Sequence, residues 1–121
     1  MWQSSRVSNV FDSVSDWYTI GEVADIFQVS VGKVRRLVEE HQLFTVRRDG
    51  EPKIPQHIIV EGEPLPSLRG TIMVLLDSGF NLDQALEWLY TEDDSLPGKP
   101  IDFLIKGHKS AVRRLAMSLA L

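Results

Sequence analysis

Three cations fall within one short segment of an otherwise acidic chain. The segment SVGKVRRLVEEH, residues 30–41, contains Lys33, Arg35 and Arg36, whereas the whole chain has a formal net charge of -4. Acids outnumber lysines and arginines on both sides of residues 33–53, and only this middle part is net positive. Because salt screens charges beyond about 8 Å, such a local cluster can bind phosphate despite distant acids.

The other residues that could take part in catalysis or bind a metal lack the spacing of such a site. His41, His57 and His108 are isolated, and no H-E-x-x-H, G-x-S-x-G or P-loop motif occurs. The acidic run at residues 92–94 is interpreted as a solvated loop. The chain has no cysteine, which excludes a disulfide or a thiolate zinc site. We therefore predict that the protein is not an enzyme and uses no metal or cofactor.

The composition predicts one small globular protein. The chain has 121 residues, of which 43% are hydrophobic, a fraction typical of folded domains. Its first residues lack the apolar run of a signal peptide, and no segment is apolar enough to cross a membrane. We expect a cytoplasmic protein without membrane contact.

Two short helices joined by a tight turn are predicted around the cation segment. Thr19 and Glu22 form a T-x-x-E capping box, and Ser30 is a second N-cap. The apolar residues that follow each cap recur at helical spacing. They are Ile20, Val23, Ala24 and Phe27 in the first helix, and Val31, Val34, Leu37 and Val38 in the second. This arrangement is a helix-turn-helix, whose second helix can enter a DNA major groove.

A basic β-hairpin is predicted directly after the two helices. Asp49 and Gly50 give a strong turn signal between two short runs of β-forming residues. A two-residue turn would pair Val46 with Lys53, whereas a three-residue loop would pair Val46 with Ile54 and match the apolar faces better. Pro at position 52 predicts an edge strand. In either register the tip is basic, and a hairpin in this position is a wing.

The second half of the chain predicts a helical domain. The segment EGEPLP, residues 61–66, is interpreted as a linker. Residues 68–76 predict a helix that is apolar almost all round, and Asn81 caps the next helix. Its inward positions are Leu82, Ala85, Leu86, Trp88 and Leu89. After a loop, a helical turn is predicted over residues 101–105 and a final helix over 109–121.

The run YTIGEVADIFQVSVGKVRRLVEEHQLFTVRRDGEPKIP resembles the winged helix-turn-helix modules of excisionases and MerR-type proteins. The matching residues are Thr19, Glu22, Val23, Ala24, Val29, Ser30, Val34, Leu43, Arg47 and Ile54. One departure is Gln28, where the family often has glycine in the turn. A position of this kind can require a positive φ, which costs Gln more than Gly.

From Tyr18 onward the chain looks like small actinobacterial DNA-binding proteins that join such a module to a helical C-terminal domain. Its segment GFNLDQALEWLYTEDDSLPGKPIDFL is also similar to the toxin-binding C-terminal domain of Xre/ParS-type antitoxins. Trp88, Leu89, Pro100 and Leu104 carry that second resemblance.

These observations predict a mainly α protein: a winged helix-turn-helix with a short β-hairpin wing, followed by a helical C-terminal domain. The expected boundaries are a flexible tail over residues 1–16, the DNA-binding domain over 17–60 and the C-terminal domain over 61–121. The expected function is sequence-preferring binding of double-stranded DNA and transcription regulation. The predicted DNA-binding residues are Ser30, Lys33, Arg35, Arg36, Arg47, Arg48 and Lys53.

The C-terminal domain is expected to support a homodimer or to bind a protein partner. The alternative function is that of an antitoxin-like interaction module, in which this domain grips a partner protein and DNA binding is secondary.

Overall fold

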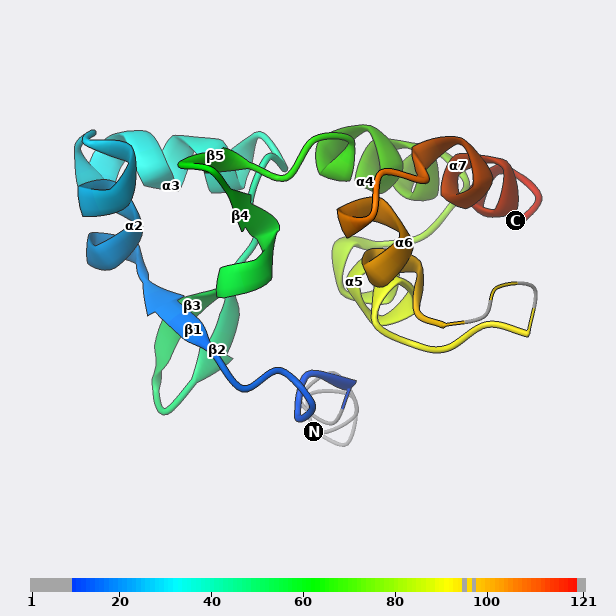
Figure 1. The fold of residues 1–121 in the computed structure, drawn as a ribbon, viewed down its shortest axis with the longest axis horizontal. Helices are drawn as coiled ribbons and strands as arrows, with labels where there is room; N and C mark the ends of the chain where they lie inside the picture. The colour runs from blue at the N-terminus through cyan, green and yellow to red at the C-terminus, as the bar shows by residue number, and fades with distance from the viewer. Residues whose placement is uncertain (1–9, 95, 97, 120–121) are drawn as a thin grey trace. The chain divides into compact units, whose positions relative to one another are not determined.

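The computed structural model describes residues 10–94, 96 and 98–119, and it divides the chain into two compact units (Figure 1). Val14–Arg69 form one unit, which we call the winged unit. Gly70–Leu121 form the other, the helical unit, together with the described residues before Val14. Within these described residues, no helix is long and apolar enough to cross a membrane.

Both predicted helices of the helix-turn-helix are present and begin at the predicted caps. Helix α2 spans Ile20–Phe27, and its capping box is complete, because Glu22 N donates to Thr19 Oγ1 while Thr19 N donates to Glu22 Oε1. Helix α3 spans Val31–Glu39 and is capped by Ser30, whose Oγ accepts from Lys33 N at 3.1 Å. The turn between them places Gln28 at φ 58°, the left-handed conformation expected at this position.

The wing adopts the two-residue turn, and its strand register pairs Val46 with Lys53. Asp49 and Gly50 have φ values of 55° and 82°, as a type I′ turn requires. Strand β2 (Val46–Arg48) pairs with β3 (Glu51–Pro55). The three-residue alternative, although it matched the apolar faces better, is not adopted. A local turn preference therefore decided the register.

The prediction that Pro52 lies on an edge strand is wrong, because β3 is the central strand of a three-stranded antiparallel sheet. Strand β1 (Trp17–Thr19) pairs with the other side of β3, giving the order β1–β3–β2 (Figure 1). Its pairing with β3 begins at Lys53, one residue past Pro52. The missing amide hydrogen of Pro52 therefore costs no bond to β1, which explains how the proline fits a central strand.

The segment predicted as a linker forms a second small hairpin. Strand β4 (Ile59–Val60) follows a 3₁₀ turn at Gln56–Ile58 and pairs with β5 (Glu63–Pro64). Glu61 and Gly62 both have positive φ, as the central residues of the wing turn do. Leu65 then turns inward, is 5% exposed and donates its backbone N–H to Ile58 O. Strands of two residues are too short to show an alternation of apolar and polar residues. The prolines and acids of this segment therefore indicated a linker.

The core of the winged unit lies between the two helices and the sheet. Helix α2 packs against α3, β1 and β3. The buried side chains of this core include Val23, Val34, Leu37, Leu43, Phe44, Val46, Ile54 and Ile58. Val31 was predicted to belong to this set, but it is 42% exposed. Each three-residue step turns a helix about 60° short of a full circle, so Val31 lies roughly 120° from Leu37.

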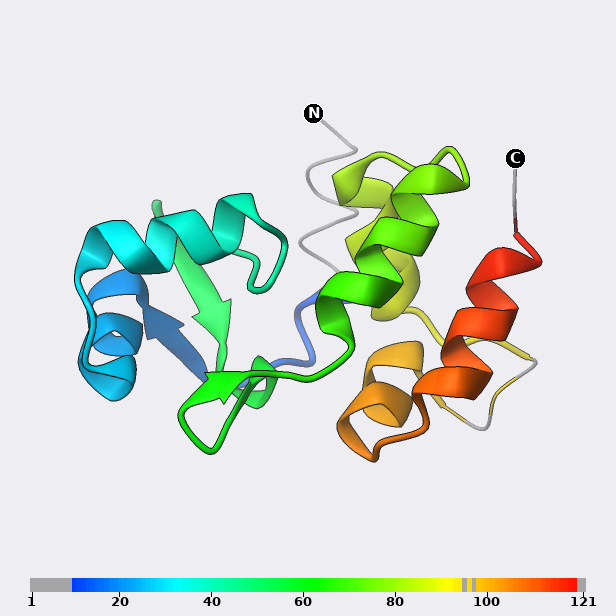
Figure 2. The same cartoon turned by 90° about the horizontal axis from the view of Figure 1, so that it is seen from above.

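Four helices of the helical unit lie wholly within the described residues, and Figure 2 gives a second view of them. They are α4 (Leu68–Asp77, whose first two residues belong to the winged unit), α5 (Leu82–Leu89), α6 (Pro100–Ile105) and α7 (Lys109–Met117). Helix α6 packs against both α5 and α7. Asn81 caps α5 as predicted, and Ala85, Leu86 and Leu89 are buried. Leu82, predicted inward, is 37% exposed, and Trp88 is half-buried.

The beginning of the described chain belongs to the core of the helical unit. Phe11 is fully buried, and its ring centroid lies 4.6 Å from that of Tyr90. Lys99 Nζ also donates to Ser13 Oγ at 2.9 Å. Residues 10–13 thus differ from the predicted flexible tail, whose residues 1–9 lie outside the described part. One phenylalanine among serines has no periodicity that could have predicted this packing.

Candidate nucleic-acid interface

The three cations of α3 lie on its solvent face. Lys33, Arg35 and Arg36 are all exposed, whereas the neighbouring Val34 and Leu37 are buried against the rest of the winged unit. The buried pair fixes the rotation of the helix about its axis, so the cations point away from the core. The arrangement predicted from the sequence is therefore present: a helix whose outer face offers charge-assisted hydrogen-bond donors suited to guanine edges or phosphates.

The N-terminus of α3 adds polar groups to the same end of the helix. Ser30 is exposed, and its Oγ accepts the capping bond from Lys33 N. A serine hydroxyl that accepts a bond can still donate its own hydrogen, and the first amides of a helix point outward along its axis. The start of α3 can thus donate to an anion such as a DNA phosphate.

The wing presents its two arginines in different environments. Arg47 is exposed, and its Nη1 donates to Gly50 O at 2.7 Å, close to the turn. Arg48 is half-buried, and its guanidinium carbon lies 5.2 Å from the centroid of the Trp17 ring, a cation–π contact. Trp17 is in turn held by a bond from its Nε1 to Val14 O. Arg47 is therefore the arginine that the wing offers most openly to a ligand.

Lys53, the third predicted wing cation, is partly committed to a partner within the hairpin. Its Nζ lies 3.5 Å from Asp49 Oδ2, and 23% of its side chain is exposed. The Asp49 side chain of this long ion pair is 88% exposed, so the pair contributes little to stability and Lys53 can exchange Asp49 for a phosphate at small cost.

Trp17 is the residue near this surface that the sequence interpretation missed. It is the first residue of the predicted DNA-binding domain, and it supports Arg48 through the face of its ring. The alternation of Trp17, Tyr18 and Thr19 is too short to predict a strand. A tryptophan two residues before the cap residue Thr19 is the signal that could have indicated a structured start.

The basic residues of α7 are not equivalent to those of α3. The guanidinium of Arg113 covers Gly70 at the start of the helical unit, where the absence of a side chain makes room for it. Its Nε is buried. Lys109 and Arg114 are exposed. Arg113 therefore takes part in packing α7 against α4, and α7 exposes two cations where α3 exposes three.

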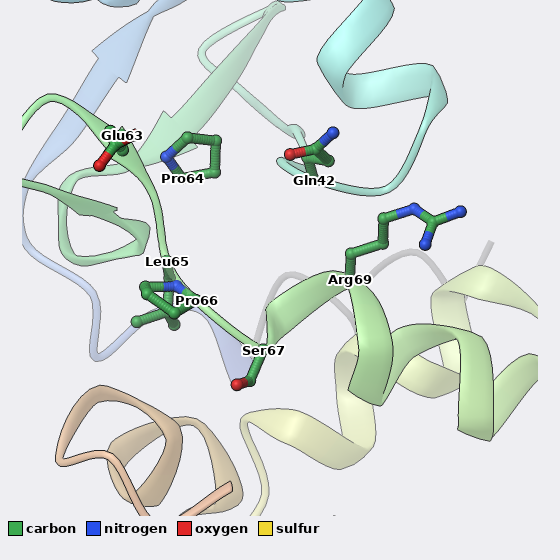
Figure 3. Close-up of a pocket in the computed structure, with 7 residues that line it drawn as sticks. All are labelled: Gln42, Glu63, Pro64, Leu65, Pro66, Ser67 and Arg69. Carbon is green, nitrogen blue, oxygen red and sulfur yellow. The ribbon is translucent and has the colours of Figure 1, made fainter.

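One shallow hollow lies elsewhere on the winged unit, beside the second hairpin (Figure 3). It has a volume of about 280 Å³ and is lined by Gln42, Glu63, Pro64, Leu65, Pro66, Ser67 and Arg69. The Nε of Arg69 donates to Glu40 O, just after the end of α3. Its lining is mixed in charge and holds no group of residues with a catalytic arrangement. Among the described residues, no three His, Cys, Asp or Glu side chains are placed to hold a metal ion.

Comparison with known proteins assigns both halves of the chain to one family. A family model described as "DNA-binding protein Rv2175c, wHTH domain" matches residues 6–59, and one described as "Rv2175c C-terminal domain of unknown function" matches residues 65–120. The chain is 30% identical to DNA-binding protein Rv2175c of Mycobacterium tuberculosis, over 93% of this chain and 86% of that protein. The chain belongs to the Rv2175c family.

The solved structures support the same assignment. The NMR structure of Rv2175c matches this fold with a TM-score of 0.79, covering 91% of this chain and 84% of that one. The predicted resemblance to small winged helix-turn-helix DNA-binding proteins is confirmed, as is the mainly α fold class. The wing and α3 lie within the first matched domain, and helices α4 to α7 lie within the second.

Proposed function

We propose that this chain binds double-stranded DNA through the winged unit and regulates transcription. Helix α3 enters the major groove, where Lys33, Arg35 and Arg36 contact base edges and phosphates. Ser30 binds a phosphate at the start of the helix, and Arg47, Arg48 and Lys53 of the wing contact the backbone. This role needs no catalytic residue, metal or cofactor, and its place is the cytoplasm, beside the DNA.

The observation that carries the proposal is the exposed cationic face of α3 on a helix-turn-helix that is fixed at both caps. Lys33, Arg35 and Arg36 are all exposed on one nine-residue helix, whereas α7, which also has nine residues and three cations, exposes only Lys109 and Arg114. Family membership supports the same function, since the relative that matches both halves of the chain bears the name of a DNA-binding protein. It also favours DNA binding over the antitoxin-like alternative.

Binding-site selection from random duplex DNA tests the function itself. Enrichment of a shared sequence is the expected result, and a pool that stays random would remove sequence-preferring binding. On the selected duplex, Lys33→Ala and Arg36→Ala should each weaken binding by about 1–3 kcal/mol, measured by fluorescence anisotropy. Arg114→Ala, which removes an exposed arginine from helix α7, is the matched control. Equal losses in all three variants would place α7 in the DNA site.

The helical unit is proposed to support self-association. Leu82, Ile105 and Met117 are large apolar side chains that remain exposed in this unit, with Met117 61% exposed. Winged modules of this size commonly bind two half-sites as dimers. Sedimentation of the full chain should show a dimer, and a fragment spanning Val14–Arg69 should sediment as a monomer that keeps weak, salt-sensitive DNA binding. A monomeric full chain contradicts this part of the proposal.

A further inference from the structure

The fold itself does not explain the residue types at two neighbouring positions at the start of α3. Gly32 is exposed and follows Val31, which is 42% exposed although valine is apolar. Val29, in the turn before the helix, is 37% exposed as well. This end of α3 is thus smooth and apolar, and Lys33, Arg35 and Arg36 follow it directly.

Gly32 is required neither by backbone conformation nor by packing. Its φ lies outside the left-handed range, and a Cβ at this position would meet only Ser30 Oγ, at 3.8 Å. Glycine also weakens a helix relative to alanine, so its presence here opposes folding. The chain holds other glycines with clear internal reasons, such as Gly50 at φ 82° and Gly70 under Arg113. Nothing in the described chain requires glycine at position 32, and, unlike Gly21, it lies between the exposed Val31 and the exposed cations of α3.

We infer that Val31 and Gly32 form a close-approach surface through which α3 reads a thymine in the major groove. The missing side chain of Gly32 lets the helix backbone approach the base edges, and Val31 then contacts the C5-methyl group, the apolar feature that distinguishes thymine there. The flanking cations argue for DNA as the occupant, because a protein partner would have to cover three positive charges together with two apolar side chains. The inference rests on the proposed placement of α3 in the groove.

Gly21 offers a matched control for Gly32. Each is the second residue of its helix, each is exposed, and a Cβ at either would meet only the oxygen of the capping hydroxyl, at 3.9 Å for Gly21. Alanine should therefore be tolerated in both folds, and melting temperatures of Gly21→Ala and Gly32→Ala should equal or exceed that of the unmodified chain. A difference between the two variants in DNA binding then reports on contact at α3 alone.

The test uses the full chain and its selected duplex. Gly32→Ala should weaken binding tenfold or more, because a methyl group enters a closed contact, whereas Gly21→Ala should leave the affinity unchanged. Replacing thymines by uracils one at a time should reveal a position where losing the methyl group weakens binding about fourfold. With Val31→Ala, the same replacement should have no effect.

Three outcomes would overturn the inference: Gly32→Ala binds as the unmodified chain does, no uracil replacement changes the affinity, or the uracil effect persists in Val31→Ala. If Lys33→Ala and Arg36→Ala still weaken binding in those cases, only the close-approach surface is wrong. If they too bind normally, the placement of α3 in the groove fails.

Discussion

Arg47 and Arg48 are adjacent in sequence but have different roles in the wing. Successive side chains of a strand point to opposite faces, so Arg47 and Arg48 lie on opposite faces of the sheet. Arg47 is exposed beside the turn, and Arg48 lies over the Trp17 ring. The sequence alone therefore suggests more positive charge on one face of the hairpin than the structure offers to a ligand.

The two wing arginines should respond differently to removal. Arg47→Ala should reduce the slope of log K against log salt by about 0.9, the value of one lost phosphate contact, without changing the melting temperature. Arg48→Ala should lower the free energy of unfolding by about 0.5–1 kcal/mol, the usual size of a partly exposed cation–π contact, and change the slope less. Salt titrations and denaturant unfolding of both variants measure this. Identical behaviour of the two would contradict the division.

Tyr90 links stability to alkaline pH. Burial, with a smaller contribution from the charge of Asp102, raises the pKa of its phenol far above the usual value. The folded state therefore binds the proton more tightly than the unfolded state, whose tyrosine titrates near pH 10. This contribution is complete below about pH 10 and is lost above it, at about 1.4 kcal/mol per pH unit. Denaturant unfolding at several pH values should show that Tyr90→Phe removes this decline. Parallel declines in both proteins would exclude Tyr90 as its source.

Among the helices and strands, the caps and turns were predictable from the sequence, whereas pairing between distant segments was not. The caps at Thr19, Ser30 and Asn81 and the Asp49–Gly50 turn each involve only a few consecutive residues, so a sequence displays them fully. Strand β1 has three residues and pairs with β3 in a distant part of the chain, whereas β4 pairs with the nearby β5 but has only two residues. Too few positions remain in such strands for alternation to be detected. The cations of the site were predictable by type, whereas the exposure of Val31 required the observed rotation of α3.

The backbone conformation of Gln28, at the turn between α2 and α3, is unfavourable for a residue with a side chain. Its φ of 58° is left-handed, a conformation that favours glycine. Gln28→Gly should raise the free energy of unfolding by about 0.5–1 kcal/mol, whereas Gln28→Ala should not, because alanine keeps the Cβ. Thermal unfolding of both variants measures the difference, and DNA affinity should stay constant. A destabilised Gln28→Gly would mean that the glutamine side chain contributes more than its backbone strain costs.

At the scale of the whole molecule, the division into units differs from the linear order of the predicted domains. The predicted boundaries at residues 16 and 60 leave the N-terminal segment free and assign residues 61–69 to the C-terminal domain. The structure instead packs Phe11 beside Tyr90, and it keeps the β4–β5 hairpin within the winged unit. Sequence patterns describe neighbours along the chain, so they could not show that residues 79 positions apart share a core.

Phe11→Ala should therefore destabilise the helical unit and spare the winged unit. Truncating a fully buried phenylalanine typically costs about 3–5 kcal/mol. Hydrogen exchange should show faster exchange in α5 and α6, with unchanged protection of α2 and α3. Val14, which is half-buried at the start of the winged unit, provides a control, since Val14→Ala should affect the opposite set of amides. Uniform loss of protection in Phe11→Ala would show that the units unfold together.

The packing of Phe11 makes the winged unit an insertion within the helical unit. The chain enters it after Ser13 and leaves it after Arg69, so it is covalently attached at both ends. A protease that cuts one bond at the exposed Asp49–Gly50 turn would therefore release nothing, because each piece remains anchored, one by Phe11 and the other by α4. Only two cuts, one on either side, would free a DNA-binding fragment, and a singly nicked molecule should migrate intact until it is denatured.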